Sequence, residues 1–204
     1  MEIKISKKPV NYENAVKYLD ERVYQVSQSK GQELIWFLEH KSVYTCGVNF
    51  NQKDVLDKKV KIVKTNRGGK ITWHGPGQLI CYFVLDISKR KKDIRKFITV
   101  IENSIIETLK YFKISSFSDR KNIGIWVLDK KKEKKIAAIG FRIKKWIAFH
   151  GFSLNLSNNL DNYKKIVPCG ISDKGISKIN NFQKISKDKI INRLKINLIK
   201  NLEY

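Results

Sequence analysis

The stretch RGGKITWHGPGQLICYF, residues 67–83, stands apart from the rest of this lysine-rich chain. It holds four of the eleven glycines, one of the three prolines and one of the three histidines, and it runs directly into an apolar segment. Glycine permits positive φ and close backbone approach, while Pro76 fixes φ and lacks an N–H, so HGPGQ predicts a sharp bend between two strands. Paired glycines are also common in ordinary loops. A lone histidine beside a turn is more often structural than catalytic, so both roles stay open for His74.

Strand-like segments extend outward from this bend in both directions. Three other segments keep the 3–4 residue apolar spacing of amphipathic helices, at 12–26, 93–112 and 184–200. Runs of strands interrupted by a few helices favour an α+β fold over a βαβ repeat. The predicted strands are 33–40, 42–47, 61–65, 70–74, 78–87, 123–129, 134–143 and 146–156, with the basic sequence KKKEK as a hairpin tip after 123–129.

Size and composition indicate one soluble domain over residues 1–204, with 42% hydrophobic residues to form its core. No apolar run approaches the ~20 residues of a membrane span, and the N-terminal MEIKISKK lacks the apolar stretch of a signal peptide. The three cysteines are odd in number and far apart, and no Cys or His spacing is typical of a metal site. We therefore expect a cytoplasmic protein with no metal and no membrane partner.

The net charge of +23 is unevenly distributed. Residues 1–66 carry 12 Lys/Arg and 8 Asp/Glu (+4), whereas residues 67–204 carry 30 and 11 (+19). Such a field attracts polyanions: nucleic acid, an anionic membrane or an acidic protein. A solvated surface on a chain rich in Lys, Ile and Asn accounts for the same excess. No RNP, KH or zinc-finger pattern is present, which argues against nucleic acid as a partner.

Two strand segments hold candidate site residues. Lys135 opens KIAAIG at 135–140, where a lysine beside apolar residues loses solvation and becomes a candidate base or stabilising cation. It also ends a run of lysines, most of which must be solvated. FHGFSLN at 149–155 repeats the His-Gly pair: Gly151 permits close approach to the backbone, and His150 is a candidate for a buried structural hydrogen bond.

The loop sequence VPCGI, 167–171, holds the candidate nucleophile. Cys169 lies between proline and glycine, a setting that leaves a thiol unhindered. Because an ordinary thiol pKa is ~8.5, this residue needs a nearby cation or base to be largely thiolate at neutral pH. Cys46 and Cys81 lie in apolar strand-like runs and are predicted to be core residues.

These segments together resemble one family. RGGKITWHGPGQLICYF, KIAAIGFRI, HGFSLNL and VPCGI, in this order, are similar to motifs of the lipoyl(octanoyl) transferases, the LipB family. LEHKSVYTCG at 38–47 resembles that family's LEHPPVYTLG, and the resemblance is clearest over about residues 35–175. It implies a biotin/lipoate protein ligase-like α+β fold, a mixed sheet flanked by helices, in a single catalytic domain.

The resemblance also implies an acyltransferase that needs no cofactor. An octanoyl group would pass from octanoyl-acyl carrier protein, through a thioester on Cys169, to a lysine of the lipoyl domains of 2-oxo-acid dehydrogenase complexes or of the glycine-cleavage H protein, as the first step of protein lipoylation. The family's paired lysine corresponds to Lys135, and we expect backbone N–H groups near Gly170 to stabilise the oxyanion. The family's substrate contacts fall on Arg67, Gly68, Gly69, Lys70, Ile71, Thr72, Trp73, His74, Ala138, Ile139, Gly140, Gly151, Phe152 and Ser153.

The chain departs from the family pattern in three places. Residues 41–42 replace two prolines, Cys46 replaces a leucine, and residues 177–179 read Ser-Lys-Ile where the family has Thr-Ser-Leu. The first two are predicted scaffold changes, and the third leaves loop or substrate contacts at that step open.

Two alternative functions remain beside nucleic-acid binding. An ATP-dependent lipoate–protein ligase would share the fold and a lysine near position 135. However, its first motif resembles RRxSGGGAVYHD, and it needs no thiol at Cys169. A catalytically inactive scaffold is the other alternative, against which the presence of both Lys135 and Cys169 argues.

Overall fold

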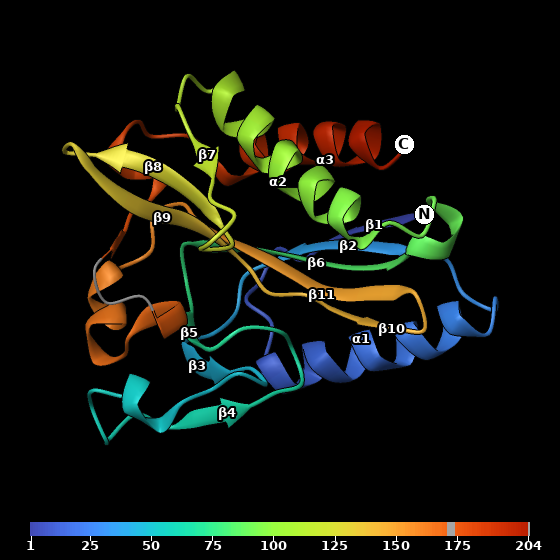
Figure 1. Ribbon diagram of the computed structural model, residues 1–204, viewed down its shortest axis with the longest axis horizontal. Coiled ribbons are helices and arrows are strands. Elements are labelled where there is room, and N and C mark those ends of the chain that lie inside the picture. Colours follow the sequence, from blue (N-terminus) through green and yellow to red (C-terminus); the bar gives the residue numbers. More distant parts are fainter. Residues whose placement is uncertain (171–173, 204) are drawn as a thin grey trace.

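The computed structural model describes residues 1–170 and 174–203 (Figure 1). Within these residues, nine strands form a mixed sheet: β1 (Glu2–Ile5), β2 (Leu34–Leu38), β6 (Gln78–Asp86), β7 (Phe117–Ser118), β8 (Ile125–Asp129), β9 (Lys132–Ile139), β10 (Arg142–Lys144), β11 (Ile147–Asn155) and β12 (Gly175–Ile176). Their order is β1-β2-β6-β11-β9-β8-β7, with β10 beside β11 and β12 beside β9. β1 pairs in parallel with β2, and β12 in parallel with β9, while the pairs along the rest of the sheet are antiparallel.

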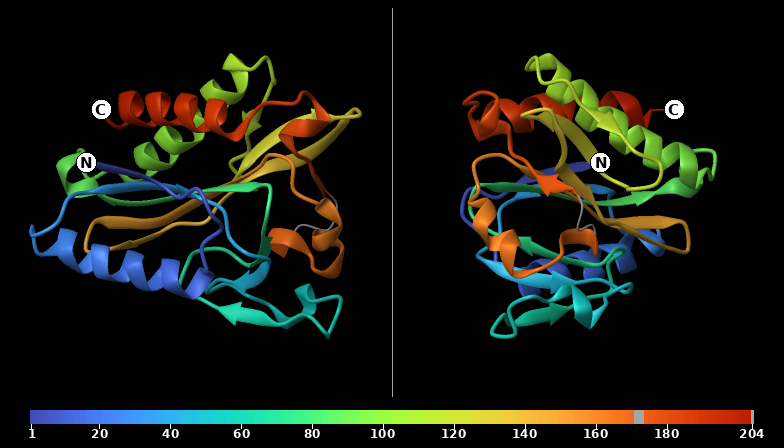
Figure 2. Two further views of the ribbon diagram at one scale, coloured as in Figure 1. Left: turned by 180° about the vertical axis from the view of Figure 1, so that it is seen from behind. Right: turned by 60° about the vertical axis from the view of Figure 1, so that its left-hand side comes forward.

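Helices cover both faces of this sheet, which confirms the predicted α+β class. α2 (Ile94–Tyr111) and α3 (Lys187–Leu202) lie together over one face, and α1 (Tyr12–Ser27) lies along the other (Figures 1 and 2). Asn11 and Asp93 cap α1 and α2, each accepting a hydrogen bond from a backbone N–H three residues on. The three helices predicted from apolar spacing are thus confirmed, with ends that differ from the predicted ones by at most three residues.

β6 is buried on both faces and separates two cores. Leu79, Cys81, Phe83 and Leu85 pack with α2 and α3, whereas Ile80, Tyr82 and Val84 pack with α1. This alternation is the period of two that a strand imposes on its side chains. It explains why the run LICYFVL is apolar throughout, and the predicted burial of Cys81 is confirmed.

A second, three-stranded sheet has the order β4-β3-β5, with β3 at Val43–Cys46, β4 at Ile62–Lys64 and β5 at Ile71–His74. The predicted bend at 75–77 therefore carries the chain from the small sheet into β6 of the large one. Gly77 takes a positive φ of 81° at this bend, and its N–H donates to the Glu39 carboxylate at 2.8 Å. Cys46, predicted as a core residue, is buried in the cluster beneath this sheet.

One predicted strand was too long. The segment 134–143 divides into β9, which begins at Lys132, and β10, which begins at Arg142. The break falls at Gly140 and Phe141, which lie between the two strands, and the Gly140 N–H still donates to Gly151 O at 2.9 Å. The short strands β1, β7 and β12 were not predicted, because runs of two to four residues carry little periodicity.

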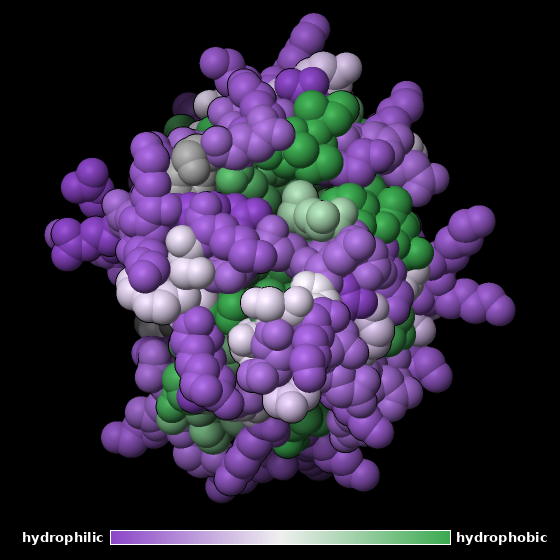
Figure 3. Space-filling model, turned by 90° about the vertical axis from the view of Figure 1, so that its right-hand side faces the viewer, coloured by the Kyte–Doolittle hydropathy of each residue, from purple (hydrophilic) through white to green (hydrophobic). Residues whose placement is uncertain are grey.

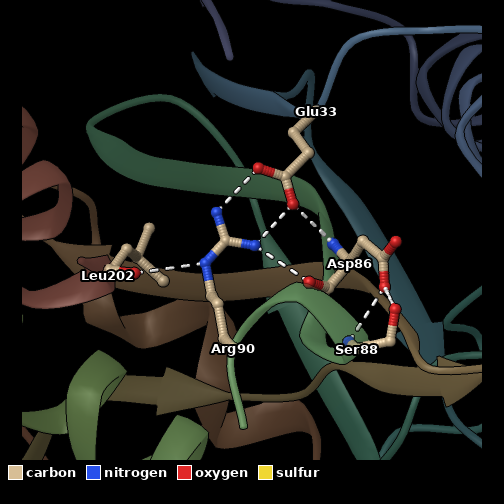
Figure 4. A network of polar contacts seen from close by, with 5 residues as sticks. All are labelled: Glu33, Asp86, Ser88, Arg90 and Leu202. Atoms are coloured by element: carbon tan, nitrogen blue, oxygen red, sulfur yellow. Dashed lines mark hydrogen bonds and ion pairs between the residues drawn. The ribbon is translucent and has the colours of Figure 1, made fainter. Parts of the chain in front are cut away.

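A polar network ties the C-terminal helix to the large sheet (Figure 4). The guanidinium of Arg90 donates to both carboxylate oxygens of Glu33, at 2.5 and 2.7 Å, and its Nε donates to Leu202 O at 3.2 Å. Arg90 also donates to Asp86 O at 2.9 Å, while Asp86 Oδ1 accepts from the Ser88 N–H. The side chains of Arg90 and Glu33 are each only 13% exposed, so this pair fixes the end of β6 against β2 and α3.

Candidate active site

A cavity of about 590 Å³ lies between the large sheet and the loop that joins β4 to β5. This volume is in the range of small-molecule binding sites. All but one of the predicted substrate contacts line it: Arg67, Gly68, Gly69, Lys70, Ile71, Thr72, His74, Ala138, Ile139, Gly140, Gly151, Phe152 and Ser153. The cavity therefore brings together three sequence segments that are far apart in the chain.

Trp73 is the exception: it does not line the cavity, and its contact with substrate stays a prediction. Its indole is 2% exposed and packs edge-on against Tyr163, 5.8 Å between ring centroids. Its Nε1 donates to Ser42 Oγ at 2.9 Å. Trp73 thus belongs to the core beneath the small sheet, on the opposite face of β5 from Thr72 and His74.

Sequence analysis missed several lining residues. Ile80 and Tyr82 of β6 line the cavity on the face that β6 turns toward α1, and period-two alternation within the apolar run could have identified them. No sequence pattern pointed to the remaining ones, which come from loops or from other elements: Asn49, Ile98, Lys121, Asn122, Ile123 and Phe141.

Arg67 braces the glycine-rich loop. It is 8% exposed, and its guanidinium donates to the carbonyl oxygens of Gly68, Thr45 and Lys70 at 2.8 to 2.9 Å. A guanidinium occupied by three backbone acceptors is held in one orientation. Arg67 therefore shapes the cavity wall.

The glycines serve backbone packing as much as ligand access. A Cβ on Gly151 would lie 2.0 Å from Cys81 O of the neighbouring strand, and one on Gly47 would lie 2.4 Å from Gly69 O. The group that approaches Gly151 most closely is therefore β6, and this is a close backbone approach of the kind predicted for this glycine.

His74 and His150 line the cavity as neutral rings. Burial lowers the pKa of His74 to about 3 and that of His150 to about 4. His74 Nδ1 contacts Gln78 Oε1 at 2.7 Å, and His150 Nε2 contacts Asn66 Oδ1 at 2.8 Å. Imidazoles with such low pKa values are weak bases at neutral pH, so the structural role favoured for both is supported.

A third buried histidine stands behind the cavity. His40 hydrogen-bonds Tyr82 through Nε2 at 2.8 Å and Val10 O through Nδ1 at 2.9 Å, and burial lowers its pKa to about 4. Its ring lies 5.9 Å from that of His74. One end of the cavity therefore borders a buried cluster of neutral polar rings.

Lys135 is the charged residue that the sequence singled out, and it is 4% exposed at the cavity wall. Its Nζ donates to Ile123 O at 2.9 Å and lies 4.9 Å from the ring centroid of Trp126. Its neighbour Lys134 instead forms an ion pair with Asp129 at 3.2 Å. The structure thus distinguishes Lys135 from the adjacent lysines, which the sequence could not do.

The side chain of Cys169 and residues 171–173 lie outside what the structure describes. The backbone of Pro168–Gly170 forms a 3₁₀ turn, and Gly170 lines the cavity together with Lys135. Gly170 has a φ of 66°, and its N–H donates to Val167 O at 3.0 Å, so this N–H, which we expected to stabilise an oxyanion, already has an intramolecular partner. A Cβ at Gly170 would lie 2.3 Å from Lys70 Nζ, which places a second lysine beside this turn.

The chain that follows Cys169 returns to the strand of Lys135. Ile176 pairs with Lys135 in the parallel β12–β9 ladder, and the Ser177 N–H donates to Lys135 O at 2.9 Å. Ser177 Oγ donates to Asp129 at 2.8 Å, and Ile179 is buried in the main core. The divergent step 177–179 is therefore scaffold, and none of its residues lines the cavity.

Comparison with known proteins places this site in a family. Residues 11–199 match the catalytic domain described as lipoyl protein ligase A/B. An octanoyltransferase of Wolbachia pipientis is 42% identical over 174 residues, covering 85% of each chain. That of Parvibaculum lavamentivorans is 42% identical over 183 residues, covering 87% of this chain and 81% of the relative. This chain belongs to the octanoyltransferase family.

Solved structures of lipoate and biotin protein ligases share the fold of this octanoyltransferase. A lipoate-protein ligase A bound with ATP superimposes with a TM-score of 0.75 at 16% identity, covering 100% of this chain and 86% of the ligase. A bi-partite lipoate protein ligase of Thermoplasma acidophilum gives 0.75 at 14% identity, covering 99% and 83%. A biotin protein ligase of Aquifex aeolicus gives 0.52 at 13%, covering 78% and 70%. The expected biotin/lipoate protein ligase-like fold is therefore confirmed.

Family membership makes the protein an acyltransferase. It disfavours nucleic-acid binding as the main function, and the names of the relatives favour the transferase over the ATP-dependent ligase. Among the described residues, no helix is long and apolar enough to cross a membrane.

Proposed function

We propose that this octanoyltransferase moves an octanoyl group from octanoyl-acyl carrier protein to a lysine of a lipoyl domain or glycine-cleavage H protein, through a thioester on Cys169. The observation that carries the proposal is that Lys135 and Gly170 line one cavity. That cavity is large enough for a small acyl ligand, and Ile80, Ile98 and Ile139 supply apolar wall.

The chemistry proceeds in two balanced steps. The Cys169 thiolate attacks the thioester carbonyl, a new C–S bond forms, the bond from the carbonyl to the carrier sulfur breaks, and the carrier leaves as a thiolate that takes a proton from the Lys135 ammonium. The acceptor amine then attacks octanoyl-Cys169, an amide C–N bond forms, and the cysteine sulfur leaves as a thiolate. The proton lost by the amine passes to a base, and Lys135, neutral after the first step, is the candidate for it.

The contacts of Lys135 indicate how it would assist the first step. Its Nζ donates to Ile123 O and faces the ring of Trp126, and both are contacts that a protonated ammonium makes. A buried cation beside the Cys169 turn would stabilise the thiolate. Lys70, beside Gly170, is a second candidate to stabilise negative charge there.

A transfer assay tests this proposal. With octanoyl-acyl carrier protein and a purified lipoyl domain, and without ATP, the acceptor should gain one octanoyl mass. Octanoate with ATP should give no product, and product from that mixture alone would support the ligase instead.

Lys135→Ala should lower the transfer rate about 100-fold or more, the range removed with a general acid or base. Lys17→Ala is the control, because Lys17 is an exposed lysine of α1 that does not line the cavity. Equal rates for the two variants would exclude Lys135 from the chemistry.

A further inference from the structure

Trp126 of β8 has contacts that the reaction scheme does not yet use. Its side chain is 1% exposed, and its indole Nε1 donates to Asn122 O at 2.9 Å. Asn122 and the following residue, Ile123, both line the cavity. The indole is therefore held in a fixed orientation directly behind the loop at 121–123.

The same ring contacts the ammonium of Lys135. The Nζ lies 4.9 Å from the ring centroid while donating to Ile123 O, so the ring and one carbonyl define its position. Gly124 has a φ of 139°, and a Cβ there would lie 3.0 Å from Lys135 Cε. The Lys135 side chain thus passes over a residue that has no side chain. Contact with the Trp126 ring is therefore what orients it.

A second lysine shares this ring. Lys174 Nζ lies 4.7 Å from the Trp126 centroid and forms ion pairs with Glu133 at 2.6 Å and Asp119 at 3.5 Å. Lys174 is the first described residue after the turn that contains Cys169, so the ring contacts both the strand of Lys135 and the chain that leaves the Cys169 turn.

We propose that Trp126 is a positioning residue for acyl transfer, whose ring fixes the Lys135 ammonium at the cavity and anchors the chain after Cys169 through Lys174. An aromatic face attracts a cation within about 6 Å of its centroid, and more strongly when the pair is desolvated. Among the described residues, the charged groups around the pair include Lys174 with its partners Glu133 and Asp119, Lys121 of the loop at 121–123, and Lys70 beside the Cys169 turn. This inference rests on the proposed pairing of Lys135 with Cys169.

The test is the rate at which iodoacetamide alkylates Cys169, followed by peptide mass from pH 5 to 10. Trp126→Leu removes the ring face, and we expect alkylation at pH 7 to slow about tenfold and the pH profile to move toward alkaline values. Trp126→Phe keeps a ring face without the indole N–H, so it should recover most of the wild-type rate and profile. The apparent KM for a small octanoyl thioester should change less than kcat in both variants.

Trp36→Leu is the matched control. Trp36 is also buried, its Nε1 donates to Ser6 Oγ at 2.9 Å, and Lys4 Nζ lies 4.6 Å from its ring, yet it is not among the residues that line the cavity. This variant should lose stability without a change in the pH profile. If Trp126→Leu does not fold, two other variants test the inference. Trp126→Phe should keep the wild-type pH profile of alkylation, and Lys174→Gln should slow alkylation severalfold.

Identical pH profiles for wild type, Trp126→Leu and Lys174→Gln would overturn the inference, as would a Phe variant no better than the Leu variant. Because alkylation requires no acyl donor, these outcomes do not depend on octanoyl transfer. A wild-type protein that forms no octanoyl-Cys169 would instead count against the proposed function alone.

Discussion

At the scale of single residues, the three histidines show what burial does to an ionisable group. His40, His74 and His150 are each at most 7% exposed, and burial lowers their pKa values to about 4, 3 and 4. The unfolded chain protonates histidine near its ordinary pKa of ~6.5. Between pH 6.5 and the lower pKa values of the folded protein, the unfolded state therefore binds more protons than the folded state.

We expect the free energy of unfolding to be fully retained above about pH 6.5 and to fall as the pH drops toward 4. The slope should be roughly 1.4 kcal/mol per pH unit for each histidine, or about 4 kcal/mol for three. Urea unfolding at pH 7.5, 6 and 5 measures it. His150→Gln should remove about a third of this slope, and a variant slope equal to that of wild type would contradict the assignment.

The sequence identified these residues but not their state. His74 and His150 each lie beside a glycine, which left catalytic and structural roles open, whereas no motif drew attention to His40. Their burial depends on Tyr82, Asn66 and Gln78, which come from other strands or loops, and a single sequence contains no record of such contacts. For the same reason, only the structure distinguishes Lys135 from Lys134: their contacts are with residues distant in sequence or on another strand.

At the scale of elements, the close pairing of β6 and β11 forms one cavity wall. The Cα of Gly151 faces the backbone of Cys81 so closely that a Cβ would lie 2.0 Å from its carbonyl oxygen. Gly151→Ala must therefore separate two central strands, and we expect it to cost about 2–3 kcal/mol of unfolding free energy.

Gly175→Ala is the control for this prediction. Among the described residues, the atoms nearest to its Cβ would be those of the Lys134 side chain, at 3.5 Å, an ordinary contact. Urea unfolding should show this variant within about 0.5 kcal/mol of wild type. A Gly151→Ala protein as stable as Gly175→Ala would mean that the two strands separate without cost.

Apolar periodicity predicted where helices and strands lie better than it predicted which strands pair with each other. Helical spacing and apolar runs predicted α1, α2, α3 and most strands, because these signals are local. Whether β3 pairs with β2 or with β5 depends on long-range contacts, and the bend at Gly77 sends consecutive strands into different sheets. The cavity-lining motifs were predicted from resemblance, and the loop at 121–123 lay outside those motifs.

At the scale of the whole molecule, the charge surplus is the main unassigned property. The face shown in Figure 3 is largely hydrophilic around smaller apolar patches. Exposed lysines include Lys130 and Lys131, which form the turn between β8 and β9 with φ of 53° and 61°. The predicted basic hairpin tip is therefore confirmed at Lys130 and Lys131, whereas residues 132–134 of KKKEK already belong to β9, and a role of the tip in docking stays a prediction.

If the +19 carried by residues 67–204 attracts acidic carrier proteins, kcat/KM for octanoyl-acyl carrier protein should fall steeply with added salt. A small uncharged octanoyl thioester should show little dependence, because it gains nothing from electrostatic steering. At ~0.15 M salt the screening length is ~8 Å, so docking should weaken without disappearing. Stopped assays from 0.02 to 0.5 M NaCl, about the range over which screening changes most, measure both slopes.

The double variant Lys131→Glu, Lys132→Glu tests the basic turn between β8 and β9. It should reduce the salt dependence of kcat/KM for octanoyl-acyl carrier protein. Equal salt slopes for the carrier and the small thioester would mean that the basic surface only solubilises the protein. If the double variant has the same salt dependence as the wild type, the carrier protein docks on other lysines.

The central claim is a covalent octanoyl-Cys169 intermediate, and intact-mass analysis after incubation with octanoyl-acyl carrier protein tests it most directly. We predict one octanoyl adduct per wild-type chain, mapped to Cys169, removed by neutral hydroxylamine and lost when a lipoyl domain is added. Cys169→Ser should turn over no acceptor, and Cys169→Ala should form no adduct. An adduct that persists in Cys169→Ala, or that maps to the buried Cys46 or Cys81, would contradict the account.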